Sequence, residues 1–263
     1  MSADLTGKAA FVTGAAMGIG HGVADLLSTL GASVAMFDID QALPERASEL
    51  SAAGRSVYPV SGSVTDPENV AEGLREAAAH FGELNILINC AGVVRYGDAE
   101  ELDVAEWDLQ LDTNLRSVFL LAKYGVPYLR AAGGGTILSI ASVQAFATQR
   151  GVPAYAASKG GIVSLTRSLA VDHAADGIRA LAVAPGSVDT PMLRSAAALS
   201  AGDQRSAEDV LAEWGGSYPL GRITSVGDVA RLVAFLVSDD AAMMTGTTVT
   251  IDGGLTSQIG VVR

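Results

Sequence analysis

Residues 8–30 read KAAFVTGAAMGIGHGVADLLSTL, and this stretch decides the fold. Its first six residues form a short apolar run typical of a buried strand, and its second half has the apolar spacing of an amphipathic helix. Between the two lie Gly14, Gly18 and Gly20. Glycines let a backbone approach a pyrophosphate closely, and a helix N-terminus offers unpaired N–H groups to an anion. The stretch therefore predicts a strand, a phosphate-binding turn and a helix.

The next predicted strand ends on an acid. Residues 33–37 read as a strand, and Asp38 follows at about the 20-residue offset expected of an acid that binds a ribose. A carboxylate there accepts a hydrogen bond from the 2′-hydroxyl of NAD and repels the 2′-phosphate of NADP. Neither Met17 nor Ile39 is basic. We therefore predict NAD as the cofactor, the alternative being that Asp38 is only a turn residue at a strand end.

Strands and helices go on alternating to the end of the chain, without a composition shift or repeat that would mark a domain boundary. This pattern predicts a single α/β domain over residues 1–263, a Rossmann fold with a mostly parallel, doubly wound sheet and helices on both faces. Further strands are expected near 57–60, 85–89, 136–141, 178–184 and 247–251, and helices near 41–53, 67–81, 104–131 and 225–237. Residues 187–220 are expected to form a substrate loop or lid.

A second stretch, residues 142–159, reads SVQAFATQRGVPAYAASK and is where we expect the chemistry. Pro153 suits the first turn of a helix, so Tyr155 and Lys159 project from one helical face. An ammonium about 4 Å from the phenol supplies roughly 4 kcal/mol at an effective dielectric of about 20, which lowers the tyrosine pKa from about 10 to near 7. Ser142 follows a predicted strand and is placed to hold a substrate oxygen beside Tyr155. The alternative is a solvated amphipathic pair.

Lysine is rare in this chain, which favours the catalytic interpretation. Only Lys8, Lys123 and Lys159 occur, whereas arginine supplies nearly all other positive charge. An amine can shift its pKa and pass protons where a guanidinium cannot. Asn114 lies inside the predicted helix 104–131, where asparagine is unfavourable. It either faces solvent or marks a distortion of the helix that binds a water near Lys159.

Two other predicted strand ends have the composition of a nucleotide site. Asn89-Cys90-Ala91-Gly92 offers small side chains against which a base and ribose can lie flat. Residues 185–192, PGSVDTPM, form a turn that places backbone groups and Thr190 against a nicotinamide carboxamide.

Composition argues against several other classes of function. The 263 residues carry a formal net charge of -12 and are 49% hydrophobic, which argues against nucleic acid and acidic membranes as partners. Cys90 is the single cysteine, so no intrachain disulfide forms, and a reducing cytoplasm fits. Neither a signal peptide nor an uninterrupted apolar run of about 18 residues is recognisable, so a cytoplasmic protein without a membrane span is expected. The three histidines lie far apart, and no metal site is predicted.

Taken together, these motifs closely resemble the short-chain dehydrogenase/reductase family over almost the whole chain. They are Thr13-Gly14-x-x-x-Gly18-x-Gly20, Asn89-Cys90-Ala91-Gly92, Asn114, Ser142, Tyr155-x-x-x-Lys159 and Pro185-Gly186. The resemblance implies a seven-stranded sheet, a catalytic tetrad of Asn114, Ser142, Tyr155 and Lys159, and a homotetramer or homodimer. It also implies a cofactor site made of Gly14, Met17, Gly18, Ile19, Gly20, Asp38, Ser63, Val64, Asn89, Ala91, Gly92, Tyr155, Lys159, Pro185, Gly186, Val188 and Thr190.

The chain departs from the family pattern at two positions. Cys90 stands where a second asparagine is usual, which weakens a hydrogen bond that steadies the sheet. Ser63, before Val64, stands where an aspartate usually meets the adenine, which loosens adenine binding. Neither departure touches the tetrad.

The predicted activity is NAD-dependent interconversion of a secondary alcohol and a ketone, with Tyr155 as base in oxidation and acid in reduction. The alternatives are an NADP-linked ketoreductase, an epimerase or dehydratase that keeps its NAD bound, and a non-catalytic NAD(H) sensor.

The substrate class stays open between polyols, sugars, hydroxy acids and cyclic alcohols. Substrate-binding candidates are Ser142, Gln144, Arg150 and Tyr155, and Val94, Arg95, Phe146, Gln149, Met192, Leu193 and Trp214 are further candidates for lining the site. Gln144 and Gln149 favour a polyol or sugar, and Arg150 either pairs with an anionic substrate or serves the structure.

Overall fold

The computed structural model of the chain describes residues 3–202 and 205–259. Within these ranges one sheet of seven strands forms, in the order β3-β2-β1-β4-β5-β6-β7. Every neighbouring pair is parallel, so the predicted mostly parallel sheet is parallel throughout. The strands are β1 (Ala9–Thr13), β2 (Ser33–Asp38), β3 (Val57–Ser61), β4 (Ile86–Asn89), β5 (Gly135–Ile140), β6 (Ile178–Pro185) and β7 (Thr248–Ile251).

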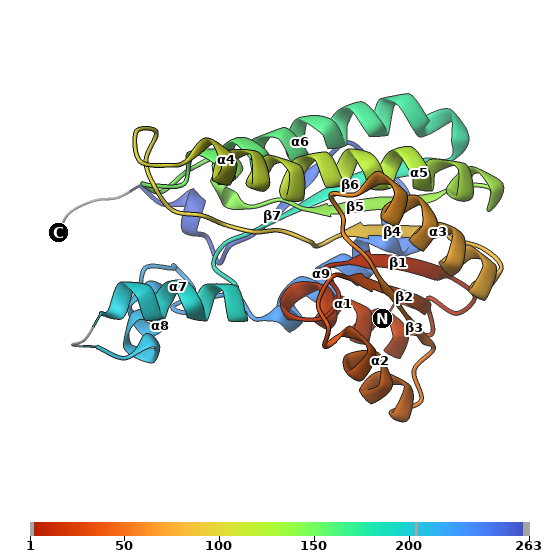
Figure 1. Cartoon of the computed structure of the whole chain (residues 1–263), viewed down its shortest axis with the longest axis horizontal. Coiled ribbons are helices and arrows are strands. Elements are labelled where there is room, and N and C mark those ends of the chain that lie inside the picture. The colour runs from red at the N-terminus through yellow and green to blue at the C-terminus, as the bar shows by residue number, and fades with distance from the viewer. Residues whose placement is uncertain (1–2, 203–204, 260–263) are drawn as a thin grey trace.

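Helices cover both faces of this sheet (Figure 1). They are α1 (Gly18–Thr29), α2 (Leu43–Ala52), α3 (Pro67–Phe81), α4 (Val104–Leu111), α5 (Ser117–Ala131), α6 (Pro153–His173), α7 (Pro191–Ala201), α8 (Ala207–Gly216) and α9 (Val226–Val237). The side chains of α1, α2 and α9 share one core cluster, and those of α3, α5 and the end of α6 share another. None of the helices described is long and apolar enough to cross a lipid bilayer. The predicted doubly wound α/β fold is confirmed.

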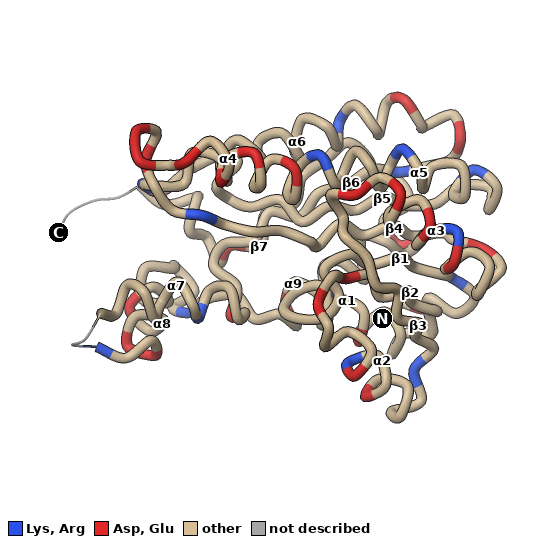
Figure 2. Tube along the Cα trace, in the orientation of Figure 1, with Lys and Arg blue, Asp and Glu red and all other residues tan. Residues whose placement is uncertain are grey.

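Strand β1 shows why the sequence alternates so little between apolar and polar residues. All five of its residues are buried, because each face of the sheet carries helices. Ala10 and Val12 pack into the core beneath α1, α2 and α9, while Ala9 and Phe11 pack into the core beneath α3 and α5. Charged residues lie mainly on the helices and connecting loops (Figure 2). A strand buried on both faces therefore reads as a continuous apolar run.

Successive strands are added to one side of β1 as far as β3 and to its other side from β4 onward. This change of direction in the strand order determines where the glycine-rich turn lies. Strand β1 pairs with β2 on one side and with β4 on the other, which opens a crevice at the carboxyl ends of the strands. Gly14 sits in this crevice with a φ of +66°, and a Cβ atom there would lie 2.7 Å from the backbone N of Ala91. At Gly20 a Cβ atom would lie 2.0 Å from the carbonyl oxygen of Gly14. The turn therefore requires glycine at both positions.

The predicted helix 104–131 is interrupted. It consists of α4 and α5 joined by a π-helical segment, Asp112–Arg116, with Asn114 at its centre. The expected distortion at Asn114 is confirmed, because the asparagine side chain turns inward there to bond to other parts of the chain. The solvent-facing alternative is wrong, since only 1% of Asn114 is exposed.

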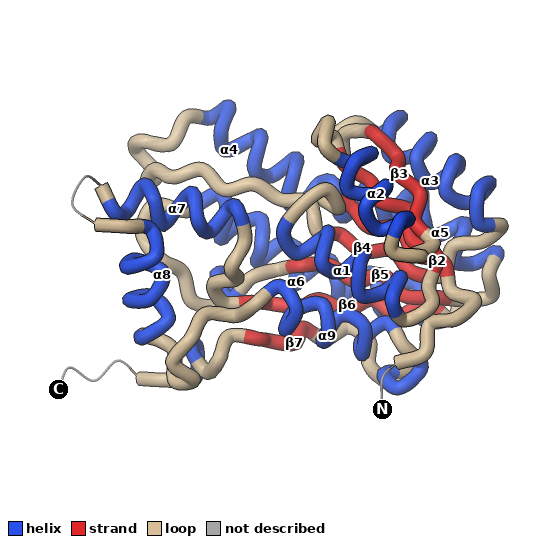
Figure 3. Tube along the Cα trace, turned by 90° about the horizontal axis from the view of Figure 1, so that it is seen from below, coloured by secondary structure: helices blue, strands red, loops and turns tan. Residues whose placement is uncertain are grey.

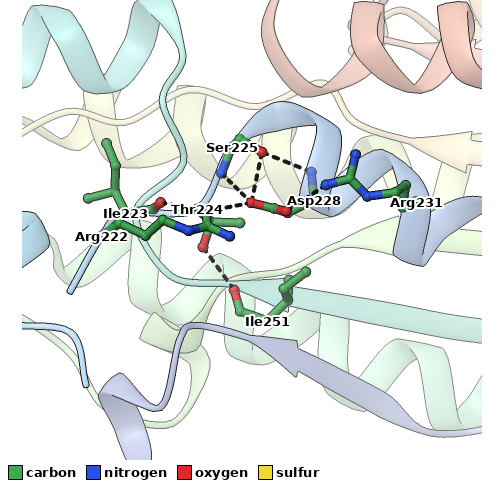
Figure 4. A network of polar contacts seen from close by, with 7 residues as sticks. All are labelled: Arg222, Ile223, Thr224, Ser225, Asp228, Arg231 and Ile251. Carbon is green, nitrogen blue, oxygen red and sulfur yellow. Dashed lines mark hydrogen bonds and ion pairs between the residues drawn. The ribbon is translucent and has the colours of Figure 1, made fainter. Parts of the chain in front are cut away.

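A polar network at the N-terminus of α9 holds this helix against the preceding segment (Figure 4). Ser225 Oγ accepts a hydrogen bond from the backbone N of Asp228 at 3.1 Å, and the Asp228 carboxylate accepts one from the backbone N of Ser225 at 3.0 Å. The same carboxylate accepts hydrogen bonds from Arg222 at 2.7 Å and Arg231 at 2.6 Å. Asp228 therefore closes a capping box and also ties two arginines to it.

Replacing Asp228 with alanine is expected to destabilise the protein by about 1–2 kcal/mol at neutral pH, because the carboxylate half of the capping box and the hydrogen bonds from Arg222 and Arg231 are lost. The hydrogen bonds from Arg222 and Ser225 hold the pKa of Asp228 well below its usual range. A depressed pKa means that the carboxylate stabilises the fold above its unfolded-state pKa of about 4, and that this stabilisation is lost as the pH falls below that value. Urea unfolding at about pH 7 and about pH 3 should therefore show that the difference in free energy of unfolding between wild type and variant is smaller in acid.

Glu45→Ala is the control for the Asp228 variant. Glu45 is an exposed acid in the first turn of α2, so its removal tests the effect of the helix dipole alone. A difference in free energy of unfolding between wild type and Asp228→Ala that increases in acid would contradict the stabilising role of the Asp228 carboxylate.

Candidate active site

A cavity of about 890 Å³ lies at the carboxyl ends of the strands. Its walls come from the chain segments that follow β4, β5 and β6, from the first turns of α6, and from α7 and α8. Figures 1 and 3 show α7 and α8 as a lobe beyond the end of the sheet. The cavity therefore lies between the sheet and this lobe.

Three of the predicted catalytic side chains meet in this cavity: Ser142, Tyr155 and Lys159. Ser142 follows β5, and its Oγ accepts a hydrogen bond from the backbone N of Gln144 at 3.1 Å. Lys159 is buried, and its Nζ donates to the carbonyl oxygen of Ile140 at 2.8 Å while lying 5.4 Å from the centre of the Tyr155 ring. Tyr155 and Lys159 therefore face the cavity and the core, and the alternative that they form a pair on a solvent-exposed helix face is wrong.

The electrostatics of this pair differ from the sequence-based expectation. Burial raises the pKa of Tyr155 to about 12, a hydrogen bond with Ser142 opposes that rise, and the nearby Tyr96 adds to it. Burial also lowers the pKa of Lys159 to about 8. The predicted pKa near 7 for the phenol is wrong, because desolvation of the phenolate is the largest cause and raises the pKa, and the hydrogen bond with Ser142 only partly opposes it. Tyr155 is thus a neutral phenol at neutral pH.

Asn114 does not line the cavity but holds its wall from behind. Its Oδ1 accepts a hydrogen bond from the backbone N of Val93 at 2.8 Å, and its Nδ2 donates to the carbonyl oxygen of Val93 at 2.9 Å and to Ser158 Oγ at 3.1 Å. A Cβ atom on Gly92 would lie 3.3 Å from Asn114 Oδ1 and 3.7 Å from Lys159 Nζ. Asn114 and the Lys159 amine therefore both lie beside Gly92, and a water between them remains a prediction.

The predicted cofactor residues fall into two groups along one crevice. Ile19, Gly92, Tyr155, Lys159, Pro185, Gly186, Val188 and Thr190 line the cavity itself. The others lie outside this lining, along the turn at residues 14–20 and at the ends of β2, β3 and β4. Asp38 at the end of β2 pairs in register with Ser61 of β3. The Asp38 carboxylate accepts hydrogen bonds from the backbone N of Ala16 at 2.9 Å and of Asp40 at 3.0 Å. The acid is therefore fixed against the glycine-rich turn.

This crevice fits a dinucleotide. The cradle at Gly14 and Gly20 has no room for a Cβ atom, and α1 begins at Gly18 with its first N–H groups free of helical partners. The far end of the crevice offers a carboxylate for a ribose hydroxyl, and its near end opens into the cavity that holds Tyr155.

The loop after β6 is supported by residues that sequence analysis did not single out. The backbone N of Ser187 donates to Tyr218 Oη at 2.5 Å, and the Ser187 carbonyl accepts from the backbone N of Thr224 at 2.9 Å. The Thr224 carbonyl accepts from the backbone N of Asp189 at 3.0 Å, and Thr224 Oγ1 donates to the carbonyl oxygen of Ile251 (Figure 4). No sequence motif marks Tyr218 or Thr224, because both act through contacts between distant segments.

The two departures from the family pattern have local consequences. At Cys90 the strand end is steadied by Thr13, whose Oγ1 accepts from the backbone N of Cys90 at 3.2 Å and of Ala91 at 3.3 Å. Burial raises the pKa of the Cys90 thiol to about 12. At Ser63 the backbone N donates to Asn69 Oδ1 at 3.0 Å, so the segment after β3 is held by α3.

The substrate candidates separate clearly in the structure. Val94, Gln144, Gln149, Met192, Leu193 and Trp214 line the cavity, whereas Arg95, Phe146 and Arg150 do not. Arg150 is exposed, and Arg95 pairs with Glu106 at 2.9 Å. Among the described residues that line the cavity, Lys159 alone carries a charge.

A parallel sheet with a glycine-rich cradle at its switch point, opening onto a serine, a tyrosine and a lysine, defines a dinucleotide-dependent oxidoreductase. Comparison with known proteins agrees. A family model described as enoyl-(acyl carrier protein) reductase, one of the short-chain dehydrogenase/reductase models, matches residues 14–256.

Several relatives match over nearly the whole chain. A cis-4-hydroxycyclohexanecarboxylate dehydrogenase of Sinomonas cyclohexanicum is 38% identical, over 95% of this chain and 97% of its own length. A cyclohexanol dehydrogenase of Acinetobacter sp. (strain SE19) is 35% identical over 98% of both chains. Among solved structures, the ligand-free aldohexose dehydrogenase of Thermoplasma acidophilum superposes with a TM-score of 0.91 at 32% identity, covering 100% of this chain and 99% of its own.

The chain therefore belongs to the short-chain dehydrogenase/reductase family. It is an oxidoreductase that acts on CH–OH groups with a nicotinamide cofactor.

Proposed function

We propose that the protein is an NAD-dependent dehydrogenase that interconverts an uncharged cyclic secondary alcohol and the corresponding ketone. The observation that carries this proposal is the cavity in which Ser142 and Tyr155 meet, because its described lining has no charged side chain except Lys159. A substrate carboxylate or phosphate would find no arginine among these lining residues.

The four residues of the tetrad have distinct proposed roles. Ser142 and Tyr155 hold the alcohol oxygen, and Tyr155 takes its proton during oxidation and returns it during reduction. Lys159 supplies a positive charge that stabilises the phenolate once it forms, and it holds the cofactor's ribose. Asn114 fixes the backbone at Val93 and anchors a water near Lys159. The bound cofactor supplies the hydride acceptor.

The preference for NAD rests on the end of β2. Asp38 places a carboxylate beside the glycine-rich turn, and the neighbouring exposed side chains of Met17 and Ile39 are apolar. A carboxylate accepts hydrogen bonds from a ribose diol and repels a 2′-phosphate, which would need a cation in the same place.

The proposed substrate class rests on the character of the cavity walls together with the relatives. Met192, Leu193 and Trp214 offer apolar surface for a hydrocarbon ring in the cavity that also holds Ser142 and Tyr155. Two relatives are named for cyclohexanol and for a hydroxycyclohexane carboxylate. Because Arg150 lies outside the cavity, we favour the uncharged ring over the carboxylate.

A substrate panel tests this function. With NAD, kcat/KM for cyclohexanol is expected to exceed that for cis-4-hydroxycyclohexanecarboxylate by about tenfold or more, because a carboxylate would be desolvated without a partner. NADH absorbance measures both reactions, with glucose as the sugar control. A higher value for the carboxylate would overturn the substrate class, and a lack of free NADH with every alcohol would overturn the dehydrogenase.

The raised pKa of Tyr155 predicts how this activity depends on pH. Oxidation needs the phenolate as a base, and burial raises the pKa of this group to about 12. The oxidation rate should therefore rise as the pH increases from about 6 to about 8, the range in which Lys159, whose pKa burial lowers to about 8, still carries the charge that stabilises the phenolate. Ketone reduction, which needs the neutral phenol, should not rise over this range. Tyr128→Phe, a change on α5 outside the cavity lining, is the control and should leave both profiles unaltered. Oxidation that slows over this range would contradict the assignment of Tyr155 as the base.

The segment 187–220 is proposed to serve as the lid of this cavity. Residues 203–204 of this segment lie outside the described residues. On either side of them, α7 contributes Met192 and Leu193 to the cavity and α8 contributes Trp214. This lobe is therefore proposed to cover a ring-shaped substrate with apolar side chains.

A homodimer or homotetramer is proposed for the assembly. Its support is a shallow groove of about 610 Å³ between the π-helical segment, α5 and α6, in which Phe119 is 49% exposed. The groove is lined by Leu111, Leu115, Phe119 and Leu165 together with Asp112, Arg116, Ser164 and Ser168. Gly161 also lines this groove, although its lack of a side chain makes room for Leu115 of the same chain. Light scattering should show an oligomer for wild type and a smaller species for Phe119→Glu, and a wild-type monomer would contradict the proposal.

A further inference from the structure

The segment that follows β4, residues 90–97, alternates in its contacts like a strand although it belongs to no strand of the described sheet. Its even-numbered residues, Cys90, Gly92, Val94 and Tyr96, all line the cavity. Its odd-numbered residues donate their backbone N–H groups to acceptors on other segments. This period of two is that of an extended strand, so the segment acts as a continuation of β4 into the active site.

Four separate acceptors replace the missing strand partner. Ala91 N donates to Thr13 Oγ1 at 3.3 Å, and Val93 N donates to Asn114 Oδ1 at 2.8 Å. Arg95 N donates to Gln110 Oε1 at 3.0 Å, and Gly97 N donates to the carbonyl oxygen of Gly151 at 3.0 Å. From Ala91 onward every second N–H of the segment is thereby bound, as it would be beside a neighbouring strand, while the N–H of Cys90 shares the Thr13 Oγ1 acceptor at 3.2 Å.

The spacing of Gln110 and Asn114 along the chain matches the spacing of the two N–H groups that they bind. Gln110 and Asn114 are four residues apart, about one helical turn, where α4 passes into the π-helical segment. Val93 and Arg95 are two residues apart, which corresponds to about 6.6 Å along an extended chain. Two successive turns of the helical region therefore hold two successive odd-numbered residues.

Gln110 is the acceptor whose side chain serves neither the tetrad nor the sheet. It is fully buried, and its Nε2 donates to the carbonyl oxygen of Glu106 at 3.2 Å, which orients the amide. Its Oε1 is thereby aimed at the backbone N of Arg95, between the two cavity residues Val94 and Tyr96. A buried glutamine on α4 thus fixes the cavity wall from behind.

We propose that Gln110 is a positioning residue which, through Arg95 N, sets the wall formed by Val94 and Tyr96 and so determines how well ring-sized alcohols fit. This proposal rests on the alcohol dehydrogenase function proposed above. Ser142 and Tyr155 come from other segments, so a displaced wall alters selectivity more than it alters the chemistry.

The test replaces Gln110 with methionine, which has a similar length but no strong acceptor. The ratio of kcat/KM for cyclohexanol to that for 2-propanol is expected to fall about tenfold, mainly through KM for cyclohexanol. Hydrogen exchange read by mass spectrometry should show lost protection in residues 92–98. Asn85→Leu is the matched control, because Asn85 Oδ1 accepts from Ala9 N at 2.8 Å at the amino ends of the strands, away from the cavity. It should leave the ratio unchanged.

A second variant tests the same wall without altering the core. Tyr96 is 49% exposed, and Tyr96→Ala is expected to lower the same selectivity ratio. If Gln110 acts through the wall, the double variant should shift the ratio no further than the larger single change. Additive shifts, or unchanged exchange in Gln110→Met, would overturn the proposal. A wild type that oxidises neither alcohol would overturn the proposed function, and the exchange measurement would still decide the role of Gln110.

Discussion

Tyr155→Phe is expected to lower kcat for alcohol oxidation by about 10²- to 10⁴-fold, because the variant keeps the ring but removes the group placed to move the proton. The phenol lines the cavity together with Ser142, and Lys159 Nζ lies 5.4 Å from its ring centre. Cofactor affinity, measured by NADH fluorescence titration, should change little, because the crevice at the glycine-rich turn is untouched. Turnover retained at the wild-type rate would remove Tyr155 from the mechanism.

The double change Asp38→Ala with Ile39→Arg is expected to reverse the cofactor preference. Loss of a charge-assisted hydrogen bond to the ribose costs roughly 1.5–3 kcal/mol, and a new arginine–phosphate pair adds a comparable gain for NADP. Together these effects should shift the ratio of kcat/KM for NADP to that for NAD by about 10²- to 10⁴-fold. Oxidation of one alcohol with each cofactor, followed by absorbance of the reduced nicotinamide, measures this ratio.

Two single variants separate the causes of that shift. Asp38→Asn keeps an oxygen for the backbone N of Ala16, which Asp38 binds at 2.9 Å, but removes the negative charge. Ile39→Arg adds the cation while the carboxylate remains, so it should gain less for NADP than the double variant. A wild-type enzyme that already prefers NADP would show that the carboxylate serves only the turn.

Local patterns were sufficient to predict the architecture. Strand β1 appears as an apolar run because both faces of the sheet carry helices, and Gly14 and Gly20 stand where a Cβ atom would collide with backbone. Ser142 follows the end of β5, and Tyr155 lies in the first turn of α6, so both were placed by signals within a few residues. The meeting of these two segments in one cavity was expected because the sheet is parallel.

Contacts between residues far apart in the chain could not be predicted from these local patterns. Gln110 reads in the sequence as one more polar residue of a helix, and only its bond to Arg95 N shows that it supports the cavity wall. Tyr218 acts through the backbone of Ser187, 31 residues away in the chain. Arg150 was a substrate candidate because it lies close to Ser142 in the sequence, yet it does not line the cavity.

The sequence by itself determined the strand and helix order, the glycine cradle and the identity of the groups at the site, because these depend on residue type and short spacing. Only the tertiary structure decided the charge state of Tyr155, the inward turn of Asn114 and the exclusion of Arg150 from the cavity. The physical reason is that desolvation and buried hydrogen bonds depend on which distant segments pack around a group.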